Sequence, residues 1–403
     1  MSQRIIPIAP VAPAADHGAP LEFKGPPPLA LYIHVPWCVQ KCPYCDFNSH
    51  EARGDIPEAA YIDALLADAE AALPLVWGRP VETVFFGGGT PSLLAPEAVD
   101  RLLARLRALL PFSPVAEITL EANPGTMEAG RFAAFRGAGI NRLSLGIQSF
   151  YDDRLRALGR IHGGAEARAA AALAARHFDT FNLDLMYGLP GQGLPQALAD
   201  LETALAFAPP HLSCYQLTLE PNTRFAAEPP ANLPDADAGA DMQEAIEARL
   251  AQAGYANYET SAFARPHHRC RHNLNYWHFG DYLGIGAGAH SKLTLHDRVL
   301  RQMRWKHPAT YLENVSAGRP LHDEHEVPRE ALPFEFLMNA LRLGDGFTPA
   351  LFEARTALPL ATILPRLQEA AAEGLLAIGP ERIAPTPRGR RFLNVLLERF
   401  LPA

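Results

Sequence analysis

The chain has 403 residues, of which 48% are hydrophobic and 20% are charged, and its formal net charge is −8. This composition is typical of a globular protein with a large core and excludes a wholly disordered or fibrous chain. The acidic balance argues against general binding to nucleic-acid backbones. No apolar run is long enough to cross a membrane as a helix, so we expect a soluble protein.

The amino-terminal 29 residues are rich in Pro and Ala. Arg4, an apolar stretch and the sequence from Ala12 to Ala14 faintly imitate a secretory signal. Because prolines interrupt any helix there, we interpret residues 1–29 as a flexible leader. The chain has five cysteines, an odd number without a disulfide framework, which predicts a reducing, cytoplasmic compartment.

From residue 30 onward, short strand-like runs alternate with helical patterns. The expected strands are Leu31–Val35, Val81–Phe86, Glu117–Glu121, Arg142–Gln148, Phe181–Met186 and His211–Leu219. The expected helices are Pro57–Leu73, Pro96–Leu110, Glu128–Arg136, Gly164–His177 and Leu194–Phe207. Six β-then-α units predict an α/β fold with a parallel sheet and outer helices over residues 30–235. Six units are too few for an eight-fold barrel, so we expect a partial (βα)6 barrel with ligands at the carboxyl ends of its strands.

The remainder of the chain follows a different pattern. Residues 221–239 are expected to form a connector, and residues 236–307 are expected to complete the barrel with a helix and a strand. Residues 308–403 are expected to form a small, mostly helical, winged-helix-like domain. Its expected elements are the helices Glu330–Leu343 and Leu360–Ala372, a hairpin of Leu375–Ile378 with Arg382–Pro385, and the helix Arg388–Phe400. The hairpin carries little positive charge, so nucleic-acid binding is not expected.

Three cysteines follow the first expected strand. Cys38, Cys42 and Cys45 lie in CVQKCPYC with C-x3-C-x2-C spacing. Three thiolates on one loop can bind three irons of a [4Fe–4S] cluster and leave the fourth iron open to another ligand. The alternative is a four-coordinate zinc site, with His34 or His50 as the fourth ligand.

Six separated segments carry a resemblance to a known family. They are YIHVPWCVQKCPYCDFNSH (32–50), FFGGGTPSLL (85–94), EANPG (121–125), LSLGIQSF (143–150), LGRIH (158–162) and NLDLMYGLPGQ (182–192). The chain resembles radical S-adenosylmethionine (SAM) proteins, specifically the branch of oxygen-independent coproporphyrinogen III oxidases and heme chaperones. The resemblance runs from about Leu29 to the end and favours an iron–sulfur cluster over zinc. It implies a radical SAM barrel.

The resemblance also implies cofactor roles for individual residues. SAM would chelate the open iron of the cluster. In the family, an electron from the reduced cluster can cleave the sulfonium of SAM and so produce a 5′-deoxyadenosyl radical. The residues implied to bind SAM are Tyr32, Tyr44, Gly88, Gly89, Thr90, Glu121, Gln148, Arg160 and Asp184. The tyrosines would flank the cluster and adenosine, and the glycines would allow close approach to the amino-acid part of SAM.

A second segment suggests a site for heme. The stretch HHRCRHNLNYW spans residues 267–277, and HNxxYW resembles the heme-binding motif of the chaperones, here His272, Asn273, Tyr276 and Trp277. Imidazole is a common axial ligand of heme iron, and the two aromatic rings offer flat apolar area. We interpret His272 as the ligand. The alternative is a solvated loop with Tyr276 and Trp277 packed in the core.

One departure separates the two functions within this branch. The oxidases carry a further cysteine where this chain has Phe47, and their extended amino-terminal segment has no counterpart in the Pro/Ala-rich leader. The sequence therefore predicts a heme chaperone that binds heme and a SAM-coordinated [4Fe–4S] cluster and transfers heme to acceptor hemoproteins such as respiratory enzymes.

Two alternatives remain. One is a coproporphyrinogen III oxidase that converts two propionates to vinyls, and the other is a radical SAM enzyme with an unrelated substrate. No residue is assigned as catalytic. The resemblance implies peripheral association with the inner face of the membrane, and a homodimer is left open.

Overall fold

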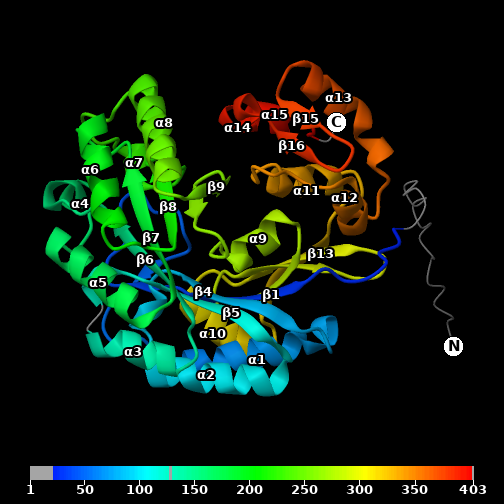
Figure 1. The fold of residues 1–403 in the computed structure, drawn as a ribbon. Helices are drawn as coiled ribbons and strands as arrows, with labels where there is room; N and C mark the ends of the chain where they lie inside the picture. Colours follow the sequence, from blue (N-terminus) through cyan, green and yellow to red (C-terminus); the bar gives the residue numbers. More distant parts are fainter. Residues whose placement is uncertain (1–20, 127–128, 402–403) are drawn as a thin grey trace, which may run out of the picture.

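The computed structural model describes residues 21–126 and 129–401 (Figure 1). Most of the predicted leader, residues 1–20, lies outside the described residues. Residues 21–28 are held against the body, since the Phe23 N–H donates to the His296 carbonyl at 3.0 Å and Leu21 packs on the carboxyl-terminal core. The last part of the predicted leader is therefore packed.

A twelve-stranded sheet forms the framework of the protein. Its strand order is β14-β13-β12-β11-β1-β4-β5-β6-β7-β8-β10-β9. The six predicted strands are adjacent and mutually parallel, which confirms the partial barrel. They are β1 (Leu29–Val35), β4 (Val81–Gly88), β5 (Phe112–Ala122), β6 (Arg142–Gln148), β7 (Thr180–Tyr187) and β8 (His211–Gln216).

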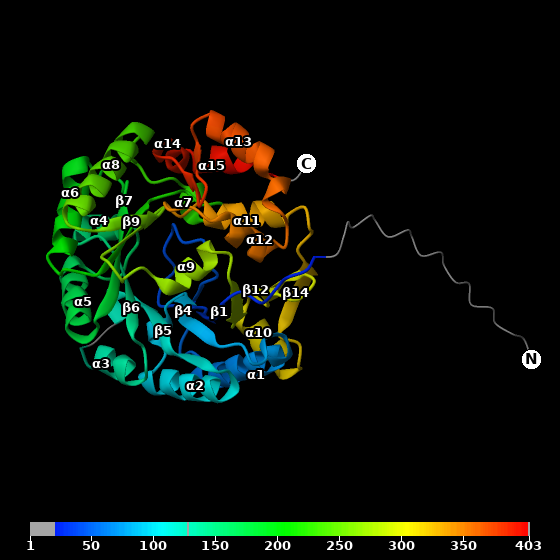
Figure 2. The same cartoon turned by 45° about the vertical axis from the view of Figure 1, so that its right-hand side comes forward.

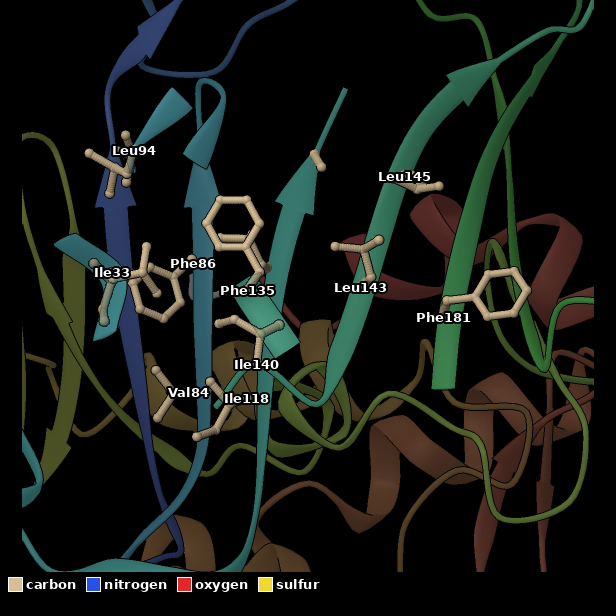
Figure 3. Packing of buried hydrophobic residues seen from close by; sticks show 14 of the residues in the cluster. Ile33, Val84, Phe86, Leu94, Ile118, Phe135, Ile140, Leu143, Leu145 and Phe181 are labelled. Atoms are coloured by element: carbon tan, nitrogen blue, oxygen red, sulfur yellow. The ribbon is translucent and has the colours of Figure 1, made fainter. Parts of the chain in front are cut away.

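Helices cover the outer face of this curved sheet (Figures 1 and 2). They are α1 (Glu58–Val76), α2 (Pro96–Leu109), α3 (Ala129–Gly137), α5 (Gly164–His177), α6 (Leu194–Leu205) and α8 (Ala236–Gln252). Alternate strand residues such as Ile33, Val84, Phe86 and Leu143 face these helices, and Phe135 of α3 packs against them (Figure 3). This apolar layer fixes the strands and leaves their inner faces free to carry polar groups.

Further strands extend both edges of the barrel, and of these only β9 matches a predicted strand, the one expected within residues 236–307. On one side β11 (Asp281–Ile285) runs parallel to β1 and is followed by the antiparallel strands β12 (His290–Thr294), β13 (Val299–Arg304) and β14 (Leu321–Glu326). On the other side, β10 (Ala262–Ala264) and β9 (Ala256–Glu259) are antiparallel to β8 and to each other. Buried polar residues such as Lys292 and Arg304 interrupt the apolar pattern of these strands.

Shorter elements connect the barrel units. They are β2 (Trp37–Cys38), β3 (His50–Glu51), η1 (Pro91–Leu93), η2 (Pro124–Thr126), α4 (Asp152–Ala157), α7 (Arg224–Ala227) and α9 (Arg271–Trp277). The expected connector 221–239 thus contains α7 and the start of α8. None of the helices among the described residues is both long and apolar enough to span a bilayer.

A separate apolar core holds the carboxyl-terminal helices and hairpin together and also includes Phe279 and Val299. Its elements are α11 (Leu332–Ala340), α12 (Pro349–Thr356), η3 (Leu360–Thr362), α13 (Leu364–Ala372), β15 (Leu376–Ile378), β16 (Ile383–Pro385), α14 (Pro387–Arg391) and α15 (Leu393–Glu398). The antiparallel hairpin is confirmed. The prediction of a single closing helix over Arg388–Phe400 is wrong. Phe392 does not have helical geometry and divides this segment into α14 and α15. Helix α10 (Pro308–Ser316) packs against α1 instead.

A buried ion pair joins the barrel to its added strands. Asp68 on α1 accepts from the Arg304 guanidinium at 3.2 Å, from the Tyr311 hydroxyl at 2.9 Å and from the Gly286 N–H at 3.2 Å. Both charged side chains are at most 1% exposed. Because a buried charge without its partner is strongly unfavourable, this network fixes β13 and α10 against α1.

Replacing Asp68 by Ala should lower the free energy of unfolding by about 3–5 kcal/mol, since it leaves the Arg304 charge buried and unpaired. Chemical denaturation followed by circular dichroism measures this loss. Glu228→Ala is the matched control, because its pair with Arg224 is solvent-exposed and should contribute less than about 1 kcal/mol. Equal losses in the two variants would contradict this interpretation.

Candidate functional site

Three thiols lie on the loop that follows β1, at the carboxyl end of the parallel strands. All five cysteines of the chain are free, and Cys38, Cys42 and Cys45 are half-buried whereas the other two are buried. The Thr90 hydroxyl lies 3.5 Å from the Cys38 sulfur, and the Arg160 guanidinium lies 3.4 Å from the Cys42 sulfur. Burial raises the pKa of the Cys38 and Cys45 thiols, so iron binding would have to displace their protons.

The glycines after β4 hold this loop by close backbone contact. The Gly89 N–H donates to the Val35 carbonyl at 2.8 Å, and the Thr90 N–H donates to the Trp37 carbonyl at 2.7 Å. A Cβ on Gly89 would lie 2.5 Å from that carbonyl oxygen, and Gly88 has φ +114°. A side chain at Gly89 would therefore displace the cysteine loop, and a Cβ at Gly88 would lie 2.6 Å from the His34 ring of β1.

The histidines near the loop make hydrogen bonds of their own. His34 is bonded through Nδ1 to the Tyr32 hydroxyl at 3.0 Å and through Nε2 to the Asn48 carbonyl at 2.9 Å. His50 Nε2 lies 3.3 Å from the Asn48 side-chain oxygen. Within residues 21–126 and 129–401, no three His, Cys, Asp or Glu side chains are arranged around a single metal ion. Three thiols that line one cavity without converging on a point suit a larger group such as an iron–sulfur cluster.

The cavity next to the loop brings together eight of the nine residues predicted to bind SAM. They are Tyr44, Gly88, Gly89, Thr90, Glu121, Gln148, Arg160 and Asp184, and the three cysteines line the same space. Tyr32 is the exception, because it lines the two neighbouring cavities. The strand ends of β4, β5, β6 and β7 supply most of these residues, as the partial barrel predicts.

Sequence reasoning missed the residue that links the two sides of this cavity. Asn123 donates to the Thr90 hydroxyl at 2.9 Å and accepts from Arg160 at 2.5 Å. Arg160 also donates to the Gly146 carbonyl at 2.9 Å. The asparagine within EANPG, directly after β5, was the available signal.

Two carboxyl groups, those of Glu121 and Asp184, line this cavity. Burial, together with the charge of Asp184, raises the pKa of Glu121 to about 8, and burial raises the pKa of Asp184 as well. A cation bound here would favour the ionised carboxylates. Gln148 has φ +66°, an unfavourable backbone conformation for a residue with a side chain, which is typical of binding sites.

The predicted heme residues form helix α9, which lies inside the barrel between the strands and α11 (Figures 1 and 2). His272 is 1% exposed. Its Nδ1 lies 2.9 Å from the Thr83 hydroxyl, and its Nε2 lies 3.2 Å from the Tyr276 hydroxyl. Burial lowers the pKa of His272 to about 3, so the imidazole is neutral.

The other members of the motif divide between two environments. Asn273 and Tyr276 line a cavity inside the barrel together with His272. Trp277 is partly buried and packs under Arg342, whose guanidinium lies 4.3 Å from the ring centre, so this residue has the packing role of the alternative interpretation. The motif is therefore a cavity wall on one side and a packing surface on the other.

A wider groove lies beside the inner cavity and the cysteine loop. It shares Tyr32, Phe85, Glu121 and Tyr276 with the inner cavity, so these side chains separate the two spaces. Phe47 lines the groove and is 60% exposed. Lys41, Lys306 and His290 add polar groups to its wall. Aromatic faces and amines together suit a flat apolar ligand that carries negative charge.

Comparison with known proteins assigns both parts of the chain. Residues 32–204 match the radical SAM superfamily, and residues 327–392 match the HemN C-terminal domain. The chain is 51% identical to heme chaperone HemW of Escherichia coli over 377 residues, covering 93% of this chain and 98% of that protein. It is 49% identical to heme chaperone HemW of Haemophilus influenzae over 381 residues, covering 93% and 98%. The solved structure of coproporphyrinogen III oxidase HemN from Escherichia coli, described as a radical SAM enzyme, superimposes with a TM-score of 0.79 at 27% identity over 93% of this chain and 90% of that one.

Replacing Cys38, Cys42 or Cys45 by Ala should remove most of the bound iron and sulfide after anaerobic reconstitution, because each thiol lines the same cavity. Iron and acid-labile sulfide analysis, together with the visible absorbance of the cluster, measures the loss. Cys214→Ala is the matched control, since this thiol is buried in the core formed by the outer helices. Full iron and sulfide in the three loop variants would rule out this ligand set.

Proposed function

This chain belongs to the HemW family of radical SAM proteins, and we propose that it is a heme chaperone that binds heme and delivers it to acceptor hemoproteins. The observation that carries the proposal is the position of α9. This helix places a neutral, buried imidazole and two further members of the HNxxYW segment on the wall of a cavity inside the barrel. That cavity adjoins an aromatic groove and the site of the three cysteines.

The site next to α9 is suited to a [4Fe–4S] cluster with SAM, as the radical SAM family implies. When bound, the cluster offers one open iron to the amine and carboxylate of SAM and can supply an electron to its sulfonium. The chain itself holds the three thiols on one loop and presents the Glu121 and Asp184 carboxyl groups toward a cationic ligand. Arg160 and Asn123 fix the opposite wall of the cavity.

His272 has the arrangement of a metal ligand oriented by a neighbouring group. The Thr83 hydroxyl bonds Nδ1 and so directs Nε2 toward Tyr276 and the inner cavity. A rotation of the Tyr276 side chain would release Nε2 and join the inner cavity to the groove, since this ring lines both. We infer that heme enters from the groove and that His272 then binds its iron.

The choice between chaperone and coproporphyrinogen III oxidase depends on Phe47. An exposed phenyl ring stands at the mouth of the site where the oxidases carry a cysteine, so this chain lacks a thiol there. A thiol can take part in redox and proton-transfer steps and a phenyl ring cannot. The ring adds apolar surface that a porphyrin face could contact.

The partners and location follow from the proposed role. We infer a cytoplasmic protein whose acceptors are respiratory hemoproteins, reached by peripheral association with the inner face of the membrane. Association into a homodimer would be an additional step.

At pH 7, SAM binding to the wild-type protein should release up to about one more proton than binding to Glu121→Gln. Below pH 8 the free Glu121 carboxyl is protonated, because burial raises its pKa to about 8, and a nearby cation favours the ionised form. Isothermal titration calorimetry in buffers of different ionisation enthalpy counts the protons.

The same experiment at pH 9 is the control. Glu121 is already ionised in the free protein there, so the difference between wild type and Glu121→Gln should vanish. An equal proton release at pH 7 would show that Glu121 does not face the bound cation.

His272→Ala should weaken heme binding at least about ten-fold and change the heme absorbance spectrum, since it removes the proposed iron ligand. Thr83→Val should have a smaller effect, because it removes only the hydrogen bond that orients the imidazole. Anaerobic optical titration of the cluster-reconstituted protein measures both effects.

The matched control is His296→Ala, which removes an exposed histidine outside the cavities and should leave heme affinity unchanged. Unchanged heme affinity in His272→Ala would move the iron ligand to another residue, of which His290 in the groove is the first to test. Absence of saturable heme binding by the wild type would overturn the proposed function.

A further inference from the structure

The inner cavity beneath α9 contains a buried guanidinium that no described group neutralises by direct contact. Arg142 on β6 is 2% exposed, and it is the one Lys or Arg among the side chains that line this cavity. Its Nε has no hydrogen-bond partner among the described residues, and it takes part in none of the ion pairs found there. A buried charge of this kind is unfavourable unless something binds it.

The two carboxyl groups that act on Arg142 through space already accept hydrogen bonds from other donors. Glu117 accepts from the His272 N–H at 3.1 Å and from the Cys270 thiol. Asp184 accepts from Asn182 at 2.7 Å and from Ser144 at 3.2 Å. Both raise the pKa of Arg142 through space, so the guanidinium keeps its charge without being fixed by either carboxylate.

Several other polar groups of this cavity are hydrogen-bonded to one another or to a neighbouring tyrosine. His211 bonds the Asn182 side-chain oxygen through Nδ1 at 2.7 Å and the Tyr258 hydroxyl through Nε2 at 2.8 Å. Ser213 donates to the same Asn182 oxygen at 3.1 Å. Because these groups satisfy one another, they form a fixed polar wall, and the Arg142 guanidinium is left as the cationic donor that this cavity can offer to a ligand.

We propose that Arg142 binds a carboxylate of the bound tetrapyrrole, a propionate of heme, inside the barrel. The proposal rests on the proposed function. A guanidinium offers two parallel N–H donors that match the two oxygens of a carboxylate. The propionate would reach it past Tyr276 and Tyr32, which line both the inner cavity and the groove. This contact would fix which edge of the macrocycle enters the barrel first.

The test compares heme with heme dimethyl ester, in which both propionates are neutral, by anaerobic optical titration at one detergent concentration. Wild-type protein should bind heme on the order of ten- to hundred-fold more tightly than the ester, as expected for a charge-assisted hydrogen-bonded pair. Arg142→Met should bind the two ligands with nearly equal affinity. Arg271→Met is the matched control, because that neighbouring arginine pairs with Glu82 at the surface, and it should keep the full preference.

Arg142→Lys provides a second variant if Arg142→Met does not fold, as judged by circular dichroism. It keeps the charge without the paired donors and should retain part of the preference. A wild type that binds both ligands equally, or a folded Arg142 variant with the full preference, overturns the assignment. Loss of SAM affinity in the Arg142 variants with unchanged heme preference also overturns it, since the carboxylate would then belong to SAM. No heme binding by the wild type overturns the proposed function together with this inference.

Discussion

The close contact between two chain segments is the constraint on which the site depends. The glycine turn after β4 lies against the cysteine loop after β1 so closely that a Cβ on Gly89 would overlap the Trp37 carbonyl. Backbone hydrogen bonds from Gly89 and Thr90 fasten the same contact. Because β1 and β4 are parallel neighbours in a packed sheet, the positions of the thiols are set by the apolar core beneath them.

The barrel connects two sites that could otherwise act independently. Glu121, Ser144 and Asp184 line both the cavity of the three thiols and the cavity beneath α9. A ligand held under α9 would therefore share polar walls with a cofactor at the cysteine loop, and the charge of one would affect the other. At the proposed site, the radical SAM scaffold would give heme a polar, partly closed environment, with Tyr276 between the inner cavity and the groove.

The sequence predicted the features that have local patterns. Six apolar strands and their helices were correct, and eight of nine proposed SAM residues line one cavity. The strands β11 to β14 were missed because their polar residues, such as Lys292 and Arg304, are satisfied only by distant partners. The same reason applies to Arg142, which stands in an ordinary strand pattern. The free guanidinium becomes visible only when β6, β7, β8 and α9 surround it.

Transfer of heme from this protein to an acceptor can be followed directly. Cluster-reconstituted protein loaded with one heme would be mixed anaerobically with the apo form of a respiratory hemoprotein, and the acceptor spectrum would be followed with time. We expect heme to pass to the acceptor faster than it dissociates into an excess of a heme-scavenging protein, and we expect His272→Ala to carry no heme to transfer. Heme that leaves the wild type at the same rate with and without the acceptor would contradict a delivery function.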